Sequence, residues 1–200
     1  MGKMRKAFQV LRSGDFGFFG NRLKKNVYST WDMELFELPR SGLPDVDLPS
    51  EYVVRKADDK DLEGIAAIWP ESFLAKGSFS RSTLDVVKKF QEETIGCHIV
   101  VFEGEIVSFV FLKDAFHWFD KPAVELAKGS THVAFRGKGI FSVLMQRAVD
   151  DIDPQAMILG QVLKGNSSSM KALRKAGFVR VGLLRTRLLL GNTKYSVVAD

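Results

Sequence analysis

A short glycine-bearing turn constrains the fold of this chain more than any other feature of its sequence. The turn is Arg136-Gly137-Lys138-Gly139-Ile140-Phe141, and two apolar runs that resemble strands, residues 123–127 and 131–135, precede it. After the turn, the spacing of an α-helix places on one face Ile140, Val143, Leu144, Arg147, Ala148 and Ile152. The pattern therefore predicts strand, tight turn and amphipathic helix in succession.

The start of such a helix is suited to binding an anion. Its first N–H groups have no acceptor within the helix and lie at the positive end of the helix dipole. Glycines at 137 and 139 remove side-chain bulk where a ligand would approach the backbone. We therefore expect a phosphate or diphosphate at residues 136–142.

Two common phosphate-binding patterns do not match this turn. A Walker motif needs Ser or Thr after its Gly-Lys pair, and here that pair is followed by Gly139. A dinucleotide fingerprint needs a third glycine at the position of Ser142, together with a second βαβ unit that the sequence lacks. A nucleotide-binding fold is therefore disfavoured.

A second motif follows an apolar run at residues 156–162. Asn166 precedes three serines at the start of a short predicted helix, which ends before Gly177-Phe178. An Arg-x-x-Gly turn, then Asn, then Gly-Phe about a dozen residues on resembles the acyl-coenzyme A binding core of the GCN5-related N-acetyltransferase (GNAT) superfamily. The resemblance covers roughly residues 51–198. It implies an α/β fold with a mixed, centrally splayed sheet flanked by helices, in the order β-α-α-β-β-β-α-β-α-β-β.

The resemblance also implies an activity, which is transfer of an acetyl group from acetyl-coenzyme A (acetyl-CoA) to a primary amine by direct attack. The acceptor would be a small molecule or an amino sugar, and the strand before the turn would hold the pantetheine arm. The residues expected at the donor site are Thr131, His132, Val133, Arg136, Gly137, Lys138, Gly139, Ile140, Phe141, Ser142, Asn166 and Ser169. Two of these residues could instead have a purely structural role, because Asn166 can cap its helix and His132 can be a structural histidine.

Glu125 is the candidate catalytic base. It lies eleven positions before Arg136, and in some histone-acetylating members of the superfamily a strand glutamate at this separation removes the amine proton. Val124 and Leu126 flank its carboxyl, and desolvation there would raise the pKa toward neutrality. The alternative is an exposed glutamate on the polar face of an alternating strand.

Two positions depart from the superfamily pattern. Many members carry a tyrosine, the acid that protonates the departing thiolate, where this chain has Leu173. The proton would then come from water or from another group such as Tyr195. The small residue that ends the phosphate turn is replaced by Phe141, whose ring must turn away from the ligand. These departures leave a rival function open, a domain that binds acyl-CoA as a sensor or scaffold without turning it over.

The acceptor pocket is poorly specified by the sequence. In the superfamily it is built from the early helices, hairpin loops and final strands, and here those regions offer Glu71, Phe73, Phe79, Phe116, His117, Trp118, Phe119 and Asp120. No cluster of His, Cys and carboxylates has the spacing of a metal site, so we expect no metal. No Ser/His/Asp set suggests covalent catalysis.

The 200 residues are 46% hydrophobic and 26% charged, as expected for one soluble domain after a basic N-terminal extension. Proline and glycine around residues 39–49 suggest a linker, so the catalytic domain is expected at 51–200 and the extension at 1–50. The extension combines lysines and arginines with phenylalanines. It could attach to membrane or nucleic acid, or pack on the body or on a second copy in a homodimer; glycines at 14, 17 and 20 favour packing.

No apolar run suits a membrane span or a signal peptide, so a cytoplasmic location is expected. The single cysteine, Cys97, lies in a short apolar run and is expected in a core strand.

Overall fold

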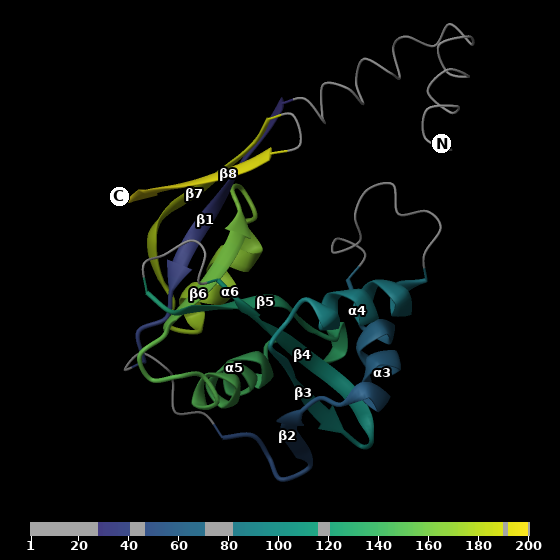
Figure 1. The fold of residues 1–200 in the computed structure, drawn as a ribbon. Coiled ribbons are helices and arrows are strands. Elements are labelled where there is room, and N and C mark those ends of the chain that lie inside the picture. The colour runs from purple at the N-terminus through teal and green to yellow at the C-terminus, as the bar shows by residue number, and fades with distance from the viewer. Residues whose placement is uncertain (1–27, 41–46, 71–81, 116–120, 190–191, 200) are drawn as a thin grey trace, which may run out of the picture. The chain divides into compact units, whose positions relative to one another are not determined.

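A computed structural model describes residues 28–40, 47–70, 82–115, 121–189 and 192–199 of the chain (Figure 1). The chain divides into two units: residues 35–181 form the larger one, and residues 1–34 and 182–200 form the smaller one. Every described residue of the candidate site belongs to the larger unit. This division follows contacts between residues and does not test the expected domain boundary at residue 51, which stays a prediction.

The larger unit is built on a mixed sheet. Its strands follow the order β2-β3-β4-β5-β6-β1, and β2 to β5 pair antiparallel. β5 and β6 are parallel. The strands are β1 (Tyr28–Glu37, of which residues 35–37 belong here), β2 (Tyr52–Lys56), β3 (Gly96–Phe102), β4 (Glu105–Asp114), β5 (Ala123–Thr131) and β6 (Met157–Leu163). The expected α/β class with a mixed sheet is confirmed.

Helices cover both faces of this sheet (Figure 1). One face packs against α3 (Leu62–Ala67) and α4 (Thr83–Glu92) through a core that includes Ile99, Phe109 and Phe111. The other packs against α5 (Ile140–Asp150) and α6 (Ser167–Lys175) through Val100, Val110 and Leu112. Adjacent residues of β3 and β4 thus face opposite cores, as the alternation of a strand requires.

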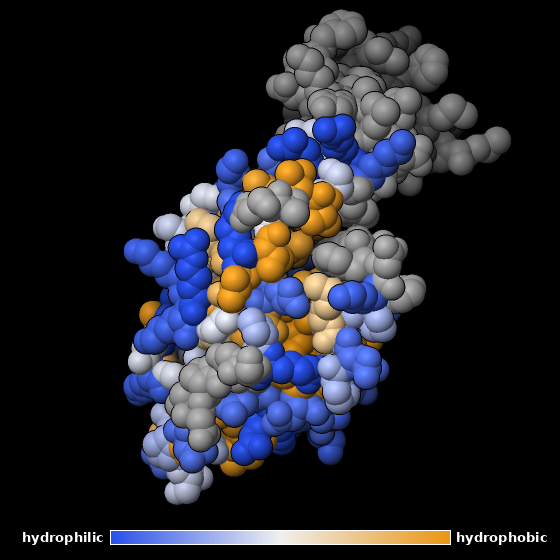
Figure 2. Space-filling view, turned by 90° about the vertical axis from the view of Figure 1, so that its left-hand side faces the viewer, coloured by the Kyte–Doolittle hydropathy of each residue, from blue (hydrophilic) through white to orange (hydrophobic). Residues whose placement is uncertain are grey.

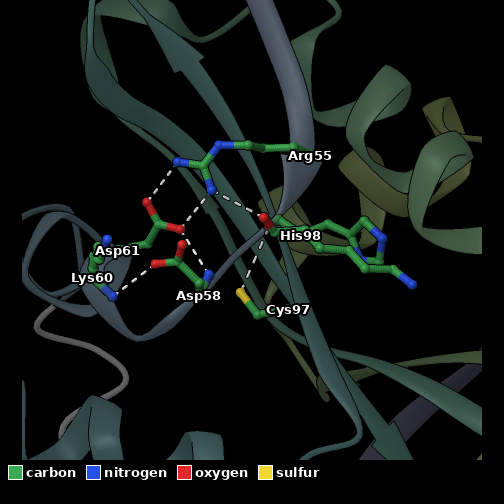
Figure 3. A network of polar contacts seen from close by, with 7 residues as sticks. Arg55, Asp58, Lys60, Asp61, Cys97 and His98 are labelled. Carbon is green, nitrogen blue, oxygen red and sulfur yellow. Dashed lines mark hydrogen bonds and ion pairs between the residues drawn. The ribbon is translucent and has the colours of Figure 1, made fainter.

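A polar network fixes the start of the α3 segment (Figure 3). The Asp58 side chain accepts from the Lys60 amide, and the Asp61 carboxylate accepts from the Asp58 amide, each at 2.8 Å. Together they form the capping box that opens the 3-10 helix η2 (Asp59–Asp61) before α3. Arg55 of β2 donates two hydrogen bonds to Asp61, at 2.6 and 2.8 Å. The network therefore joins the start of α3 to β2 of the sheet.

The smaller unit contains an antiparallel pair of strands. β7 (Val179–Leu189) continues from the larger unit and pairs with β8 (Asn192–Ala199), from Gly182 opposite Ala199 to Leu189 opposite Asn192. The Arg185 guanidinium donates two hydrogen bonds, at 2.9 and 3.1 Å, to Asp32 of β1. β7 and β8 are the last two strands of the expected order of elements.

Two local predictions are wrong. The run 131–135 is not a strand, because β5 ends at Thr131 and a 3-10 helix, η5 (Val133–Phe135), follows. The chain leaves the sheet there and brings the Phe135 ring against Tyr52 and Phe102, with centroids 6.5 and 5.4 Å away. Val133 is left 68% exposed. Arg147, placed by periodicity on the apolar face, is exposed, and its guanidinium lies 3.9 Å from the Asp150 carboxylate.

Hydrophilic residues cover most of the face of the molecule shown in Figure 2, around a smaller hydrophobic region. Cys97 is buried in β3 as expected, and desolvation raises the pKa of its thiol to about 12. Of the helices that the structure describes, none is both long and apolar enough to traverse a bilayer.

Candidate functional site

The parallel strands β5 and β6 separate part of the way along their length. Their pairing covers Ala123 with Met157, Val124 with Ile158, and Glu125 with Leu159. Both strands continue beyond this point, β5 to Thr131 and β6 to Leu163, without further pairing to each other. The backbone edge of β5 after Glu125 is therefore available to a ligand that can hydrogen-bond to it.

A bulge distorts β5 in this separated part. Phe109 pairs with Ser130 and Phe111 with Ala127, so two residues of β5, Lys128 and Gly129, lie opposite the single residue Val110 of β4. Lys128 has a φ of 50°, in the left-handed region, where a non-glycine residue is uncommon. Gly129 allows a close approach by a neighbouring ring, because a Cβ built on it would lie 2.4 Å from the Cζ atom of Phe141.

The predicted glycine-bearing turn joins β5 to α5. Gly137 and Gly139 have φ values of 81° and 80°, which explains why glycine occupies both positions. Gly139 is the N-cap of α5, and no side chain caps this helix. Within the described part of the chain, the amides of residues 137–141 have no backbone acceptor, whereas the Ser142 amide donates to the Gly139 carbonyl at 2.9 Å. The turn therefore presents free donors to an anion.

Side chains at the end of β5 brace the turn. Ser108 and Thr131 hydroxyls lie 2.8 Å apart, and the Arg136 Nε donates to the Thr131 carbonyl at 3.0 Å. The Lys138 ammonium lies 5.0 Å from the centre of the Phe135 ring. The His132 amide donates to the Val107 carbonyl at 2.8 Å, while its side chain is exposed. Thr131, Arg136 and Lys138 thus hold the turn in shape, and their positive groups remain at its surface.

The Phe141 ring does not close the turn at Gly137. Its far end lies against Gly129 of β5 and it packs on the main core, whereas a Cβ built on Gly137 would meet no atom within 4 Å. Ile140 is buried in the same core, so only its amide can face a ligand. The expectation that the ring turns toward other parts of the fold is consistent with this arrangement.

The second predicted motif opens α6. Asn166 is its N-cap, and the side-chain oxygen accepts from the Ser169 amide at 3.2 Å. The capping role left open by the sequence is therefore present. Leu173 of this helix packs on Gly160 of β6, where a Cβ would lie 3.1 Å from its Cδ1 atom. No proton donor stands at this position.

Glu125 is the last residue of β5 that pairs with β6, and it also pairs with Lys113 of β4. The Lys113 ammonium lies 6.0 Å from the centre of the Phe90 ring of α4, so this is the sheet face covered by α3 and α4. Burial raises the pKa of the half-buried Glu125 carboxyl, and the charges of Lys113 and Lys128 partly offset that rise. A carboxyl with a raised pKa is a stronger base than an ordinary carboxylate, and this one lies where the two strands separate.

A polar cluster that sequence reasoning missed lies at the far end of α5. The buried His98 ring of β3 places its Nε2 atom 2.7 Å from the Asp151 carboxylate, and the Lys56 ammonium is 3.3 Å from the same oxygen. The His98 hydrogen bond, aided by Lys56, lowers the pKa of Asp151. His98 and Asp151 are 53 positions apart, so no local signal links them.

Comparison with known protein families identifies the family of this chain. Residues 47–178 match the model of the acetyltransferase (GNAT) family. The chain belongs to the GNAT family. Members of the family are acetyltransferases, and the separated β5 and β6 are the splayed strands that the resemblance implied.

Solved structures share the GNAT fold at low sequence identity. A conserved protein of unknown function from Staphylococcus epidermidis is 14% identical, with a TM-score of 0.58, over 83% of this chain and 64% of its own. A Drosophila protein is 15% identical, with a TM-score of 0.56, over 87% and 58%. The chain thus spans less than two thirds of the length of these two proteins.

The aminoglycoside N-acetyltransferase AAC(6')-Iy in complex with CoA is 18% identical, with a TM-score of 0.54, over 68% of this chain and 92% of its own. At these identities the likeness concerns the fold alone. Comparison with curated proteins gives no match.

Most of the predicted donor-site residues lie in one stretch of the chain, which runs from the end of β5 through the turn to the start of α5. Asn166 and Ser169 belong to the next helix after β6. The residues expected around the acceptor, at 71–79 and 116–120, lie outside the described residues, as do the N-terminal extension up to residue 27 and the side chain of Tyr195. Among the described residues, no His, Cys, Asp and Glu side chains gather into a metal-binding group.

Proposed function

We propose that the protein transfers an acetyl group from acetyl-CoA to the primary amine of a small molecule or amino sugar. The observation that carries the proposal is the end of the β5–β6 ladder at Glu125, next to a helix whose first amides are free. An acyl donor with a diphosphate at one end and an amide-bearing arm at the other matches both features.

The donor would meet the protein mainly through backbone groups. Amides of residues 137–141 would bind the diphosphate, with Arg136 and Lys138 adding positive charge at the surface of the turn. The pantetheine arm would lie along the unpaired edge of β5, toward Glu125. Because the turn is held by Thr131 and Gly139 rather than by the ligand, little ordering is needed on binding.

Glu125 would act as the general base. The nitrogen of a neutral amine becomes acidic as it bonds to the carbonyl carbon, so a carboxylate at the strand separation would take one proton from that nitrogen as the new bond forms. Desolvation brings the pKa of Glu125 nearer to that of the amine and makes the carboxylate a stronger base. Its place on the α3–α4 face lets an acceptor approach from the side opposite α5.

A second function is supported by two side chains. Leu173 cannot protonate a thiolate, and Phe141 introduces a ring where the family pattern has a small residue. Both features suit a domain that binds acyl-CoA as a sensor or scaffold. Free thiol released from acetyl-CoA on adding a panel of amines, including amino sugars because AAC(6')-Iy is an aminoglycoside acetyltransferase, separates an enzyme from a binder.

Substitution of Glu125 tests the catalytic assignment. Glu125→Gln is expected to lower kcat/KM on the order of 100-fold, with CoA affinity unchanged, because proton removal is lost while the diphosphate site is intact. Wild-type activity should rise as pH rises through the raised pKa of Glu125, since only the ionised form accepts a proton.

The matched control is Glu105→Gln at the exposed start of β4, which should leave rate and pH profile unchanged. A Glu125→Gln enzyme with the wild-type rate and the same rising limb would show that the base is elsewhere. Binding is measured separately, as a rise in melting temperature with acetyl-CoA.

A further inference from the structure

Lys128 stands where the reacting end of the donor would lie. Within β5 it follows Glu125 by three residues and precedes the turn that opens α5. A pantetheine arm that runs from the turn toward Glu125 along the unpaired edge of β5 must pass this residue. This argument rests on the function proposed above.

The backbone at Lys128 is held in an unfavourable conformation. Its φ of 50° lies in the left-handed region, which L-residues adopt poorly, and glycine occupies the neighbouring position 129. Gly129 is required there for another reason, because the Phe141 ring leaves no room for a Cβ. The bulge therefore places a lysine side chain at position 128 despite the strain, and strain of this kind gathers at functional sites.

Lys128 lies within electrostatic reach of two other charged side chains. Its charge interacts with Glu125 and Lys113, both on the α3–α4 face of the sheet. Although Lys128 is exposed, desolvation lowers the pKa of its ammonium; the charge of Glu125 opposes this shift, and the charge of Lys113 adds to it. A less basic ammonium gives up its proton more readily.

We propose that Lys128 donates the proton that the departing thiolate takes up. The amine nitrogen attacks the thioester carbonyl carbon, the C–N bond forms, and the C–S bond breaks with its electron pair left on sulfur. Glu125 accepts one proton from the amine nitrogen, and sulfur receives one from the Lys128 ammonium. Transfer of the proton from Glu125 to Lys128 then restores both groups, so protons balance over the cycle.

This role supplies what Leu173 cannot. Leu173 packs on Gly160 and has no dissociable proton, so a chain that catalyses the reaction needs an acid elsewhere. Lys113 is the natural comparison, since it shares the same electrostatic cluster but belongs to the paired strand β4.

The experiment compares Lys128→Met with Lys113→Met on two acetyl donors. One is acetyl-CoA, whose thiolate is basic, and the other is the acetate thioester of a nitrothiophenol, whose thiolate departs without protonation. Lys128→Met should lose rate on the order of 100-fold with acetyl-CoA and little with the aryl thioester. Lys113→Met removes a charge that shifts the pKa values of Glu125 and Lys128, so it should move the pH profile without the selective loss with acetyl-CoA, and CoA affinity and melting temperature should stay near wild type in both variants.

Lys128→Arg separates proton donation from simple charge. A guanidinium remains protonated at every pH used, so this variant should be as slow as Lys128→Met. Recovery of rate by arginine, an equal loss with both donors, or an equal loss in Lys113→Met would overturn the role of Lys128. Wild-type protein that binds acetyl-CoA but releases no thiol with any amine would instead overturn the proposed function, and this role with it.

Discussion

The helices of the larger unit begin in two different ways. The η2–α3 segment, α4 and α6 each start with a polar side chain that accepts a hydrogen bond from a backbone amide of the first turn. The accepting residues are Asp58, Ser82 and Asn166 respectively. α5 starts at Gly139, which has no side chain to accept one. Three starts are therefore closed by the protein, and the fourth remains open to a ligand.

The difference has an energetic meaning. A side-chain cap stabilises a helix by about 1 kcal/mol, because it satisfies an amide that otherwise needs water. At α5 this stabilisation is absent, and both Gly137 and Gly139 take left-handed conformations that other residues adopt poorly. If the open start serves binding, substitutions there should change CoA affinity, whereas substitutions at the closed starts should change folding stability.

The largest effect is expected from a carboxylate in the open turn. Gly137→Asp should weaken CoA binding on the order of 100-fold, about 2.7 kcal/mol, because the carboxylate competes for the free amides and repels the diphosphate. Gly104→Asp is the matched control: Gly104 has a φ of 84°, beside 81° for Gly137, and both positions have open space around a Cβ. Aspartate tolerates the left-handed region, so both variants should fold.

Titration calorimetry with CoA measures the affinities, and melting temperatures report the folding of each variant. The strain of the two substitutions is similar, so the melting temperatures should fall equally. Equal CoA affinity in Gly137→Asp and Gly104→Asp would show that the turn is not the diphosphate site, and the contrast between open and closed helix starts would lose its functional meaning.

The features that the sequence predicted well are those that depend on a few adjacent residues. The cap at Asn166 and the glycine turn each follow from local rules about hydrogen bonding and backbone conformation. The strands and helices between residues 51 and 189 accordingly appear in the expected order.

The features that the sequence did not reveal depend on distant contacts. Phe135 leaves the sheet because Tyr52 and Phe102 lie beside it, so an apolar run that suits a strand becomes a 3-10 helix. The bulge at Lys128 depends on the register of β4, and the Arg55–Asp61 pair on how β2 meets α3. For the same reason Glu125 could be chosen from its spacing, whereas its lysine neighbours could not.

A closed start should respond in stability, and the capping box offers the largest response. Asp61→Asn is expected to lower the free energy of unfolding by about 2 kcal/mol, since the carboxylate accepts from Arg55 and from the Asp58 amide while buried. CoA affinity should not change. Urea unfolding at neutral pH measures the loss, and an unaltered midpoint would mean that the network of Figure 3 contributes nothing.

The same pair predicts a dependence on pH. The hydrogen bond from Arg55 is the main cause that lowers the pKa of Asp61 in the folded protein. A carboxyl with a lowered folded pKa stabilises the protein fully above its unfolded pKa of about 3.9, and this contribution is lost as pH falls through the folded value. The stability gap between wild type and Asp61→Asn should therefore narrow below about pH 4. A stability difference between wild type and Asp61→Asn that stays constant below about pH 4 would contradict a stabilising Arg55–Asp61 ion pair.

The smallest effect distinguishes the two roles considered for Asn166. Asn166→Ala and Ser82→Ala each remove one side-chain cap and should each lower stability by about 1 kcal/mol. Because the Asn166 oxygen already accepts from the Ser169 amide, we expect CoA affinity to be the same in both variants. Asn166→Asp keeps an oxygen that can cap the helix, and it should also leave CoA affinity intact. A CoA affinity that falls in Asn166→Ala but not in Ser82→Ala would mean that Asn166 also contacts the donor. The start of α6 would then be partly open to ligand, and the division between the two kinds of helix start would move from α5 alone to the pair of helices that flank β6.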